Sequence, residues 1–521
     1  MSKTVYFIGI DIGTSGAKAG IFDIDGNLVS LQQQEYQFVH PYPGWSEINA
    51  NIVWEKIIQV VQASVINSGL DPSEIVALGL SVLGETGLAV DENGNPVYSA
   101  IESMDQRENA YKPYVEWFEK SFGSNEIFHR TSYPLNHLPP PNKILWLRDH
   151  EPQTFSRTAK YVTFQDFVVW RMTGRPAIDY SMASRTMLFD VKRKAWISEF
   201  LQAMGITTDF LATPQVASQI AGELTEHAAK ELGLSPGTFV VPGAHDQSCA
   251  ALGVGVVREG IAGDGTGSVE AIATASKRPI QSEEMLQRGI GSQCHVTSDL
   301  YLPLGFHLSA GSLVRWFRDQ LCRWEKEEAN RLGKDAYNLI TDLAKNSPPG
   351  SNGLLVLPHW SGAGTGRVPA LNPASRGAIL GLTLAHTKAD ISRAIFEGIT
   401  FEARYIIDSL ESSGIEIEEL VVTGGGAKSP FWLQLKADIT GKRIIVPEIT
   451  EASLLGAAIL AGIGAGFYED IIDATDRVRR TRSIYEVQSD RHVAYQPIYE
   501  IYKDLYEGLI DIASRLAEIS Y

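Results

Sequence analysis

The hydrophobic pattern of the first hundred residues predicts strands joined by tight turns. Apolar runs at residues 5–13 (VYFIGIDIG) and 17–24 (AKAGIFDI) predict two strands. The Asp25–Gly26 pair predicts a hairpin turn into a third strand at residues 28–38. In residues 52–68, apolar positions recur at helical spacing, which predicts a helix. Shorter strands are predicted at residues 75–83, 86–90 and 97–103, so this region is strand-rich α/β structure.

A similar pattern returns in the second half of the chain. Residues 260–274 (GIAGDGTGSVEAIAT) repeat the order of strand, Gly-Thr turn and strand, with Gly265–Thr266 in the place of Gly13–Thr14. One short echo fits two unrelated hairpins as well as a repeated unit. A third glycine turn lies in residues 420–431 (LVVTGGGAKSPF), ahead of a stretch with helical spacing. From about Tyr495 the pattern predicts an amphipathic helix that clamps the structure.

The length of the chain predicts two large domains. One hydrophobic core rarely serves as many as 521 residues. We place the boundary between Ala251 and Glu259, where regular periodicity is lost. The N-terminal domain then comprises residues 1–253 and the C-terminal domain residues 254–521.

Composition and charge narrow the class of protein. A net charge of −17 argues against nucleic acid or an anionic membrane as the main partner. The three cysteines are widely spaced, which predicts neither a disulfide framework nor a metal cluster. The uncharged apolar stretch at residues 452–467 is too short for a membrane span and predicts a closely packed, buried helix. Because no signal-peptide pattern opens the sequence, we expect a cytoplasmic protein.

Three glycine turns carry the candidate chemistry. The motifs GxxxxGK[ST], HExxH and GxSxG are absent from the sequence, as is a GxGxxG between a strand and a helix. Their absence argues against a P-loop NTPase, a zincin, an α/β-hydrolase and a Rossmann dehydrogenase. Glycine lets the backbone approach a ligand closely, and successive N–H groups form an anion-binding nest. Each turn alone is better explained as an ordinary hairpin turn, but together they favour phosphate binding. They are Gly13-Thr14-Ser15-Gly16, Gly265-Thr266-Gly267 and Gly424-Gly425-Gly426.

Two aspartates follow apolar strands, where a buried carboxylate costs free energy unless something binds it. Asp11, beside the first turn, would suit Mg²⁺, which keeps several waters and takes few protein carboxylates. Its alternative role is to cap the N–H groups of the turn. Asp246 would begin a helix, either as a simple cap or as the base that takes a proton from a substrate hydroxyl attacking a phosphoryl group.

Four segments together resemble the FGGY family of carbohydrate kinases, which has the fold of actin, hexokinase and Hsp70. They are residues 8–23 (IGIDIGTSGAKAGIFD), 243–255 (GAHDQSCAALGVG), 263–270 (GDGTGSVE) and 421–466, which begins VVTGGGAKSPFWLQLKADITG. Their order and spacing are those of the family over nearly the whole chain. Residues 40–57 and 141–152 resemble the xylulokinase branch in particular.

The resemblance implies two actin-like (ribonuclease H-like) α/β domains with ATP in the cleft between them and the sugar deeper in the same cleft. It implies that Asp246 is the general base and that Asp11 organises Mg²⁺. A small sugar or polyol is the expected partner, and homodimers are common in the family, although no surface stripe in the sequence requires one. The implied nucleotide-binding residues are Gly13, Thr14, Ser15, Gly265, Thr266, Gly267, Gly311, Gly425 and Ser429, and the implied acceptor-binding residues are Glu85, Asp105, Asp246 and Gln247.

The sugar pocket departs from the xylulokinase pattern. Residues 83–85 (LGE) stand where xylulokinases carry Gln-Met-His-Gly, and Glu85 is closer to the glycerol kinase pattern. Asp105 and Arg107 are kept, but Ser103 replaces an aromatic residue. Since a buried polar group discriminates against a substrate that lacks its partner, these changes would alter which hydroxyls are recognised. Alternatively, Glu85 and Asp105 form an ion pair with Arg107.

These observations together predict an ATP-dependent kinase that acts by in-line transfer to a terminal hydroxyl of a ketose. Among ketoses, a pentulose is the preferred candidate. A glycerol-like polyol or the linear ketone of the autoinducer kinase is the alternative acceptor. A non-catalytic, actin-like nucleotide-binding protein is the alternative from another class. Asp246 separates the two classes, because a binding module needs no carboxylate opposite the γ-phosphate.

Overall fold

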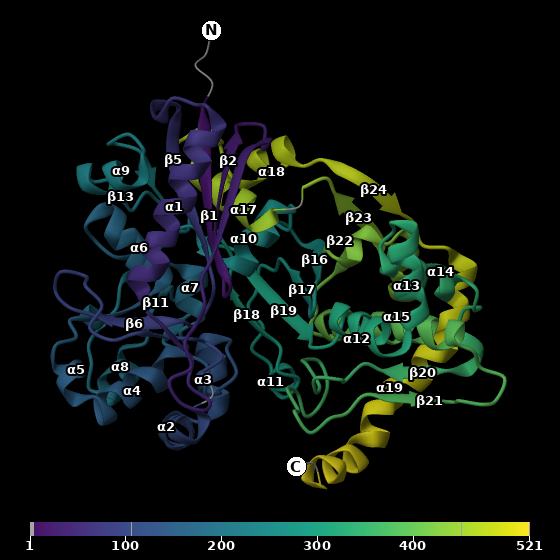
Figure 1. Ribbon diagram of the computed structural model, residues 1–521. Helices are drawn as coiled ribbons and strands as arrows, with labels where there is room; N and C mark the ends of the chain where they lie inside the picture. The colour runs from purple at the N-terminus through teal and green to yellow at the C-terminus, as the bar shows by residue number, and fades with distance from the viewer. Residues whose placement is uncertain (1–4, 106, 450, 520–521) are drawn as a thin grey trace.

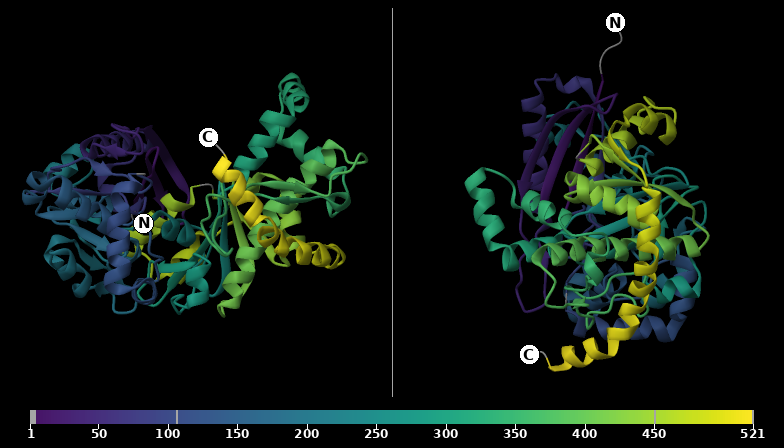
Figure 2. Two further views of the ribbon diagram at one scale, coloured as in Figure 1. Left: turned by 90° about the horizontal axis from the view of Figure 1, so that it is seen from below. Right: turned by 90° about the vertical axis from the view of Figure 1, so that its right-hand side faces the viewer.

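The computed structural model describes residues 5–105, 107–449 and 451–519. Two seven-stranded sheets lie in two lobes, side by side (Figures 1 and 2). The first sheet has the order β13-β14-β5-β1-β2-β3, with β15 beside β5, and the second has the order β18-β19-β17-β16-β22-β23-β24. The strands of the first sheet are β1 Tyr6–Ile12, β2 Gly16–Asp23, β3 Leu28–Glu35, β5 Ile75–Val82, β13 Gly222–Glu223, β14 Phe239–Val240 and β15 Ala244–His245. Those of the second are β16 Gly260–Thr266, β17 Glu270–Thr274, β18 Gly291–Cys294, β19 Tyr301–His307, β22 Ile417–Gly424, β23 Arg443–Pro447 and β24 Thr481–Tyr485.

The central hairpins of the two sheets have the same topology. In the first lobe, β1 pairs antiparallel with β2 and parallel with β5. In the second lobe, β16 pairs antiparallel with β17 and parallel with β22. The Gly-Thr echo in the sequence is therefore a repeat of structure, because each Gly-Thr turn joins a hairpin at the centre of a sheet.

The apolar stretch near the C-terminus forms α17, Ala452–Gly464, and packs on the first sheet rather than the second. It contacts β1, β5 and α10 (Asp246–Gly253). Glycines make the close approach possible, since a Cβ at Gly9 would lie 2.0 Å from the Leu454 carbonyl oxygen and one at Gly79 would lie 2.3 Å from that of Ala457. The expectation of a closely packed, buried helix is confirmed.

The long C-terminal helix α19, Ser489–Ile519, runs across the second lobe (Figure 1). A row of its tyrosines packs against α15, Lys388–Ser412, and their hydroxyls donate to carboxylates of that helix. Tyr495 donates to Glu397 at 2.7 Å and Tyr502 to Glu402 at 2.5 Å. These bonds satisfy buried charges and so fit the clamping role that the pattern predicted.

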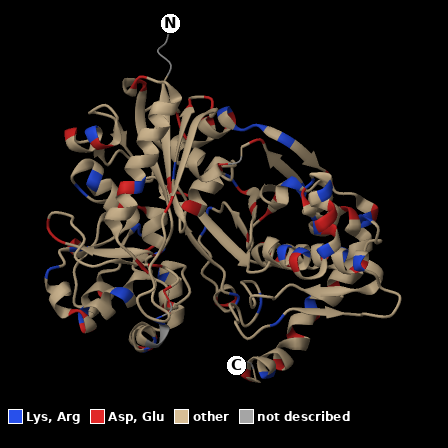
Figure 3. Ribbon diagram, viewed as in Figure 1, with Lys and Arg blue, Asp and Glu red and all other residues tan. Residues whose placement is uncertain are grey.

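The remaining elements surround the two sheets. The predicted strand at residues 97–103 is shortened to β7, Ala100–Ile101. No helix in the described part of the chain combines the length and hydropathy that a membrane crossing requires. Charged residues of both signs are spread over both lobes (Figure 3). In the first half the other elements are β4 Glu47–Ile48, α1 Ala50–Ser68, β6 Gly87–Val90, α2 Glu108–Phe122, α3 Ser124–Thr131, α4 Pro140–His150, α5 Pro152–Ser156, β8 Lys160–Thr163, α6 Phe164–Thr173, β9 Ala177–Asp179, α7 Tyr180–Ser184, β10 Phe189–Asp190, β11 Ala195–Trp196, α8 Ser198–Met204, β12 Thr213–Gln215 and α9 Glu226–Leu232. In the second half they are α11 Glu283–Gln287, α12 Gly311–Leu321, α13 Arg323–Leu332, α14 Ala336–Lys345, β20 Leu355–Leu357, β21 Ala378–Leu380, α16 Pro430–Thr440 and α18 Ile471–Val478.

Candidate active site

Two aspartates lie where the parallel strands of the first sheet end. Asp11 on β1 is in register with Ser81 on β5, and Ser81 is in register with Ala244 on β15. Two residues after Ala244, Asp246 begins α10. The Ser81 hydroxyl donates to Asp11 Oδ1 at 2.6 Å. The carboxyl edge of the sheet, a usual place for ligands in α/β folds, thus carries both aspartates that the sequence singled out.

Burial changes the proton affinity of both carboxyl groups. It raises the pKa of Asp11 to about 6, against the hydrogen bond from Ser81, and the charge of Asp246 adds to the rise. Burial also raises the pKa of Asp246 to about 6, against the hydrogen bond from the backbone N–H of Gln247. Oδ1 of Asp246 is buried and has no hydrogen-bond partner among the described residues. Asp246 is therefore largely ionised at neutral pH and keeps one acceptor oxygen available, as a general base requires.

Glu85 lies close to Asp246, whose pKa its charge helps to raise, and is held by three side chains. The Tyr133 hydroxyl donates to its carboxylate at 3.1 Å, Arg185 forms an ion pair with it, and Lys143 Nζ donates to its backbone oxygen at 2.9 Å. Its φ of 56° is left-handed, a conformation that non-glycine residues adopt where their surroundings hold them. Burial raises the pKa of Glu85, but the nearby cations, Arg185 first, outweigh it and hold the pKa below its ordinary value. The carboxylate stays charged, and its charge is offset by Arg185.

Asp105 belongs to a separate buried cluster. Its carboxylate accepts hydrogen bonds from Arg107 Nε at 2.7 Å, from the Ser46 N–H at 2.6 Å and from the Tyr111 hydroxyl at 3.1 Å. The Arg107 guanidinium in turn stacks on Trp45, 3.6 Å from the ring centroid. Both oxygens of Asp105 are thus occupied by protein donors. This geometry favours the alternative in which Asp105 forms an ion pair with Arg107. A contact of Asp105 with the sugar or polyol substrate stays a prediction.

The first glycine turn presents its hydroxyls outward. Gly13 closes the turn by donating its N–H to the Gly16 oxygen at 3.0 Å, and the Tyr36 hydroxyl donates to the Gly13 oxygen at 2.5 Å. Thr14 and Ser15 at the tip are exposed. The backbone of the turn is therefore held by hydrogen bonds, and its two exposed hydroxyl groups are accessible to a ligand beside Asp11.

The second lobe contains a cavity of about 390 Å³ where the other glycine turns converge. The turns pack tightly, since a Cβ at Gly311 would lie 2.5 Å from the Gly267 oxygen and one at Gly426 would lie 2.7 Å from Thr266 Cγ2. Gly265 lies one residue outside the cavity lining. A larger hollow of about 720 Å³ on the same lobe, at residues 276–285 and 412–415, contains none of the predicted site residues. Predicted nucleotide-binding residues that line the smaller cavity are Thr266, Gly267, Gly311, Gly425 and Ser429.

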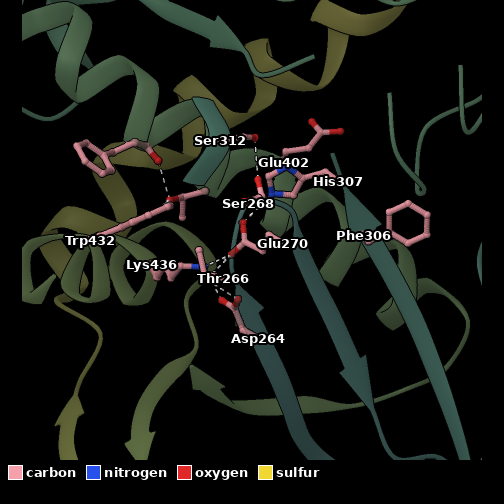
Figure 4. Close-up of polar contacts among 12 residues, drawn as sticks. Asp264, Thr266, Ser268, Glu270, Phe306, His307, Ser312, Glu402, Trp432 and Lys436 are labelled. Atoms are coloured by element: carbon pink, nitrogen blue, oxygen red, sulfur yellow. Dashed lines mark hydrogen bonds and ion pairs between the residues drawn. The ribbon is translucent and has the colours of Figure 1, made fainter. Parts of the chain in front are cut away.

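A buried charge network lies directly behind Thr266 (Figure 4). Thr266 Oγ1 lies 2.8 Å from Asp264 Oδ1 and 3.2 Å from Glu270 Oε1. Lys436 Nζ pairs with both carboxylates, and His307 Nε2 lies 2.6 Å from Glu270 Oε2. A hydroxyl has one proton to donate, and that of Thr266 is donated to the buried carboxylates of Asp264 and Glu270. The donors that this turn offers to a phosphate are its backbone N–H groups rather than the Thr266 hydroxyl.

The residues present fit a magnesium ion bound through few protein ligands. Among the described residues, no group of three or more His, Cys, Asp or Glu side chains could hold a metal. Asp11 is a half-buried carboxylate at the carboxyl edge of the first sheet, and its side-chain partners there are the hydroxyls of Ser81 and Ser453. Mg²⁺ in phosphoryl-transfer sites is held by one or two carboxylates, waters and the phosphates themselves, so a single carboxylate here is sufficient.

Sequence reasoning missed several residues of this pocket. Arg185 and Tyr133 come from segments without a recognisable motif, and Lys143 lies in residues 141–152, whose resemblance to the xylulokinase branch indicates no role for it. His245 directly precedes Asp246 in GAHDQ, so its position was a usable signal. Gln293 reaches the pocket from the other lobe, and no local pattern could have indicated this.

Comparison with known proteins identifies the family. The model of the FGGY family of carbohydrate kinases, N-terminal domain, matches residues 6–253, and that of the C-terminal domain matches residues 264–465. The chain belongs to this family and is a carbohydrate kinase, a phosphotransferase with an alcohol group as acceptor. The resemblance seen in the sequence is confirmed. Membership in a family of kinases also decides against the non-catalytic alternative.

Similar curated proteins act on different acceptors. The chain is 29% identical to a gluconokinase of Bacillus subtilis (strain 168) over 99% of this chain and 97% of that protein. It is 28% identical to a xylulose kinase of the same organism over 98% of each chain. It is 31% identical to a glycerol kinase of Streptococcus pyogenes serotype M28 over 93% of each. These names leave the acceptor open among a sugar acid, a ketose and a polyol.

Solved structures of kinases share the fold. A gluconate kinase from Lactobacillus acidophilus superimposes with a TM-score of 0.88 at 22% identity, covering 98% of this chain and all of that one. A xylulose kinase from Rhodospirillum rubrum does so with a TM-score of 0.88 at 23% identity, covering 98% and 99%. The expected class of two actin-like α/β domains is confirmed.

Proposed function

We propose that this kinase transfers the γ-phosphoryl group of ATP to a terminal hydroxyl of a neutral ketose or of a related polyol. A pentulose is the first candidate for the acceptor. The observation that carries the proposal is a pair of buried polar atoms without hydrogen-bond partners among the described residues, Asp246 Oδ1 and Arg185 Nε. One is an acceptor and the other a donor, and each costs free energy until a ligand pairs with it. A substrate hydroxyl between them would satisfy both.

The chain's own groups divide the work. Asp246 accepts the proton of the attacking hydroxyl, and the first glycine turn and the second-lobe cavity hold the phosphates from opposite sides. Asp11 would hold Mg²⁺, which would supply positive charge to the phosphates when bound. Closing the cleft around both substrates excludes water and limits hydrolysis of ATP. In this proposal residues 1–253 supply the acceptor pocket and the base, and residues 254–521 supply the nucleotide site.

The charge of the pocket favours a neutral acceptor. Glu85 and Asp246 are both carboxylates. The two cations beside them are already bonded to Glu85, Arg185 to its carboxylate and Lys143 to its backbone oxygen. An aldonate would bring a third negative charge close to these two. The unpartnered Arg185 Nε favours a sugar acid, so gluconate is the second candidate.

A coupled ADP-release assay with Mg-ATP tests the proposal on a panel of pentuloses, hexuloses, glycerol, tetritols, pentitols and gluconate. Turnover on a neutral ketose or polyol well above that on gluconate supports it, and preference for gluconate contradicts the acceptor class. Asp246→Asn is expected to lower kcat by about 10²- to 10⁴-fold, as loss of a general base does. ATP binding, followed by calorimetry, should be unchanged, and full turnover of this variant would contradict the assignment of Asp246.

A further inference from the structure

His245 and Gln293 lie beside Asp246 and have no role in the mechanism above. His245 is the last residue of β15 in the first lobe, and Gln293 belongs to β18 in the second. Gln293 Nε2 lies 3.1 Å from His245 Nδ1 and 2.7 Å from Ser248 Oγ, and all three side chains are buried. His245 Nε2 lies 3.3 Å from Asp246 Oδ1. A line of contacts therefore runs from the second lobe, through one imidazole ring, to the candidate base.

The surroundings of His245 select one tautomer. Burial and, after it, the charge of Arg185 lower its pKa to about 3, so the ring is neutral and carries a single N–H. When the Gln293 amide donates to Nδ1, the proton stays on Nε2 and faces Asp246. With the amide turned round, the proton would move to Nδ1 and the Nε2 lone pair would face a carboxylate. Repulsion between these two groups favours the first arrangement.

The ring is also fixed in place by its neighbours. The His245 backbone N–H donates to Ser181 Oγ at 2.9 Å. A Cβ at Gly84 would lie 2.8 Å from Nε2, so glycine there leaves room for the imidazole. Nε2 approaches Oδ1 without an aligned hydrogen bond, and the oxygen therefore keeps its lone pairs for a substrate hydroxyl.

We propose that Gln293 is a positioning residue that acts through His245: it keeps the imidazole proton on Nε2, 3.3 Å from Asp246 Oδ1, where the dipole of the N–H stabilises the ionised form of Asp246. The inference rests on the proposed role of Asp246 and adds a dependence on the second lobe. Because Gln293 comes from β18, the proton is kept on Nε2 only while this contact between the two lobes is made. Closure of the cleft would then complete the base as well as exclude water.

Two substitutions of Gln293 distinguish a positioning role from a packing role, because the two roles predict opposite orders of the kcat values of the variants. Gln293→Leu removes the donor to Nδ1 and is expected to lower kcat about 10-fold. Gln293→Glu has nearly the shape of the native side chain but accepts a proton from Nδ1, so it should lower kcat more, on the order of 100-fold. The KM for ATP should stay the same in both. Equal losses, or a Glu variant more active than the Leu variant, would overturn the proposal.

Variants of His245 and of a neighbouring contact complete the kinetic test. His245→Gln can place an amide N–H near the position of Nε2 and should keep several-fold more activity than His245→Ala. Ser292→Ala is the matched control, because it removes another contact between the lobes on the same strand, the 2.8 Å hydrogen bond of Ser292 with Ser132. It should change kcat less than about 2-fold. A loss equal to that of Gln293→Leu would mean that general loosening explains both.

A measurement without turnover separates this inference from the proposed function. In protein with ¹⁵N-labelled histidine, the His245 signals are assigned by their loss in His245→Ala. The expected spectrum shows a neutral ring with the proton on Nε2, and Gln293→Glu should move this proton to Nδ1. A proton on Nδ1 in the native protein would overturn the inference. If the panel yields no acceptor, the proposed function fails, while this spectrum still decides the tautomer.

Discussion

The central hairpins of the two lobes share a topology but use their carboxylates in opposite ways. When the Gly-Thr pairs of the two turns are aligned, Asp11 lies two residues before the glycine and Asp264 only one. Because successive residues of a strand face opposite sides of the sheet, this shift turns the two carboxylates to opposite faces. Asp11 lies half-buried at the carboxyl edge of the first sheet beside the hydroxyls of Ser81 and Ser453, whereas Asp264 is fully buried against the cation of Lys436. The position of the aspartate relative to the glycine thus decides whether its carboxylate enters a buried ion-pair network, and the binding role of Asp11 stays a prediction.

The two threonines of these turns differ in the same way. Thr14 is exposed at the tip of the first turn. Thr266 is buried, and its hydroxyl donates into the network of Asp264 and Glu270. The first hairpin therefore offers side chains to a ligand, and the second offers mainly its backbone. Substitutions in the first should affect catalysis and those in the second should affect stability.

Lys436→Met should have the largest effect on stability. It leaves Glu270 and Asp264 buried without their cation, a loss expected to cost about 3–5 kcal/mol. Burial raises the pKa of Glu270, but Lys436 and His307 outweigh it and hold the pKa below its ordinary value. Thermal unfolding of the variant is the measurement, and adding Glu270→Gln should restore part of the loss.

Lys345→Met is the matched control for that substitution. It removes an exposed lysine that pairs with Asp342 on the surface, where ion pairs contribute little. Its unfolding curve should overlay that of the native protein. Equal stability of Lys436→Met and the native protein would remove the structural half of the comparison.

Asp11→Asn should have the converse effect, with loss of activity and an intact fold. The amide can still accept from Ser81 but offers no charge to a metal–nucleotide complex, and kcat is expected to fall about 10²-fold or more. Because Asp11 is partly buried as a charge, the neutral amide should leave the melting temperature unchanged or slightly raised. Steady-state kinetics and thermal unfolding on one preparation check both parts. A variant that unfolds early yet keeps its kcat would reverse the roles assigned to the two hairpins.

The elements that the sequence predicted correctly are those with local patterns. The strands follow from apolar runs, the helix at residues 52–68 from helical spacing, and the buried helix from an uncharged, glycine-rich stretch. Asp11 and Asp246 could be singled out because each follows an apolar strand. The inward hydroxyl of Thr266 depends on Lys436, which lies far away in the sequence, so no local pattern could have indicated it.

The pocket itself was harder to predict than the strands. The Arg185 partner of Glu85 and the contact of Gln293 with His245 join segments that are distant in sequence. From the sequence, the ion pair of Asp105 with Arg107 could be predicted only as an alternative, because burial of both partners is a property of the folded chain. The boundary between residues 253 and 254 and the homodimer stay predictions.

Acid should weaken activity without weakening the fold through these aspartates. Burial raises the pKa of Asp11 and of Asp246 to about 6, well above their ordinary value of 3.8. Below pH 6 the folded protein binds protons at both sites more tightly than the unfolded chain does, so these protonations favour the folded state. Transfer needs the ionised base, and log kcat should fall with a slope of about one per pH unit or steeper below pH 6. A flat kcat from pH 7 to pH 5 would contradict ionised Asp246 as the base.

The paired variants Thr14→Val and Thr266→Val should have the smallest effects and contrast the two turns most directly. Valine keeps the shape of threonine, so each change removes little besides a hydroxyl. Thr266→Val takes a donor from two buried carboxylates and should cost about 1–2 kcal/mol of stability, with the KM for ATP within about 2-fold of native. Thr14→Val removes an exposed hydroxyl and should leave stability unchanged while raising the KM for ATP several-fold. If Thr266→Val instead raised the KM for ATP and left the melting temperature alone, its hydroxyl would serve the phosphate, and the two hairpins would work alike.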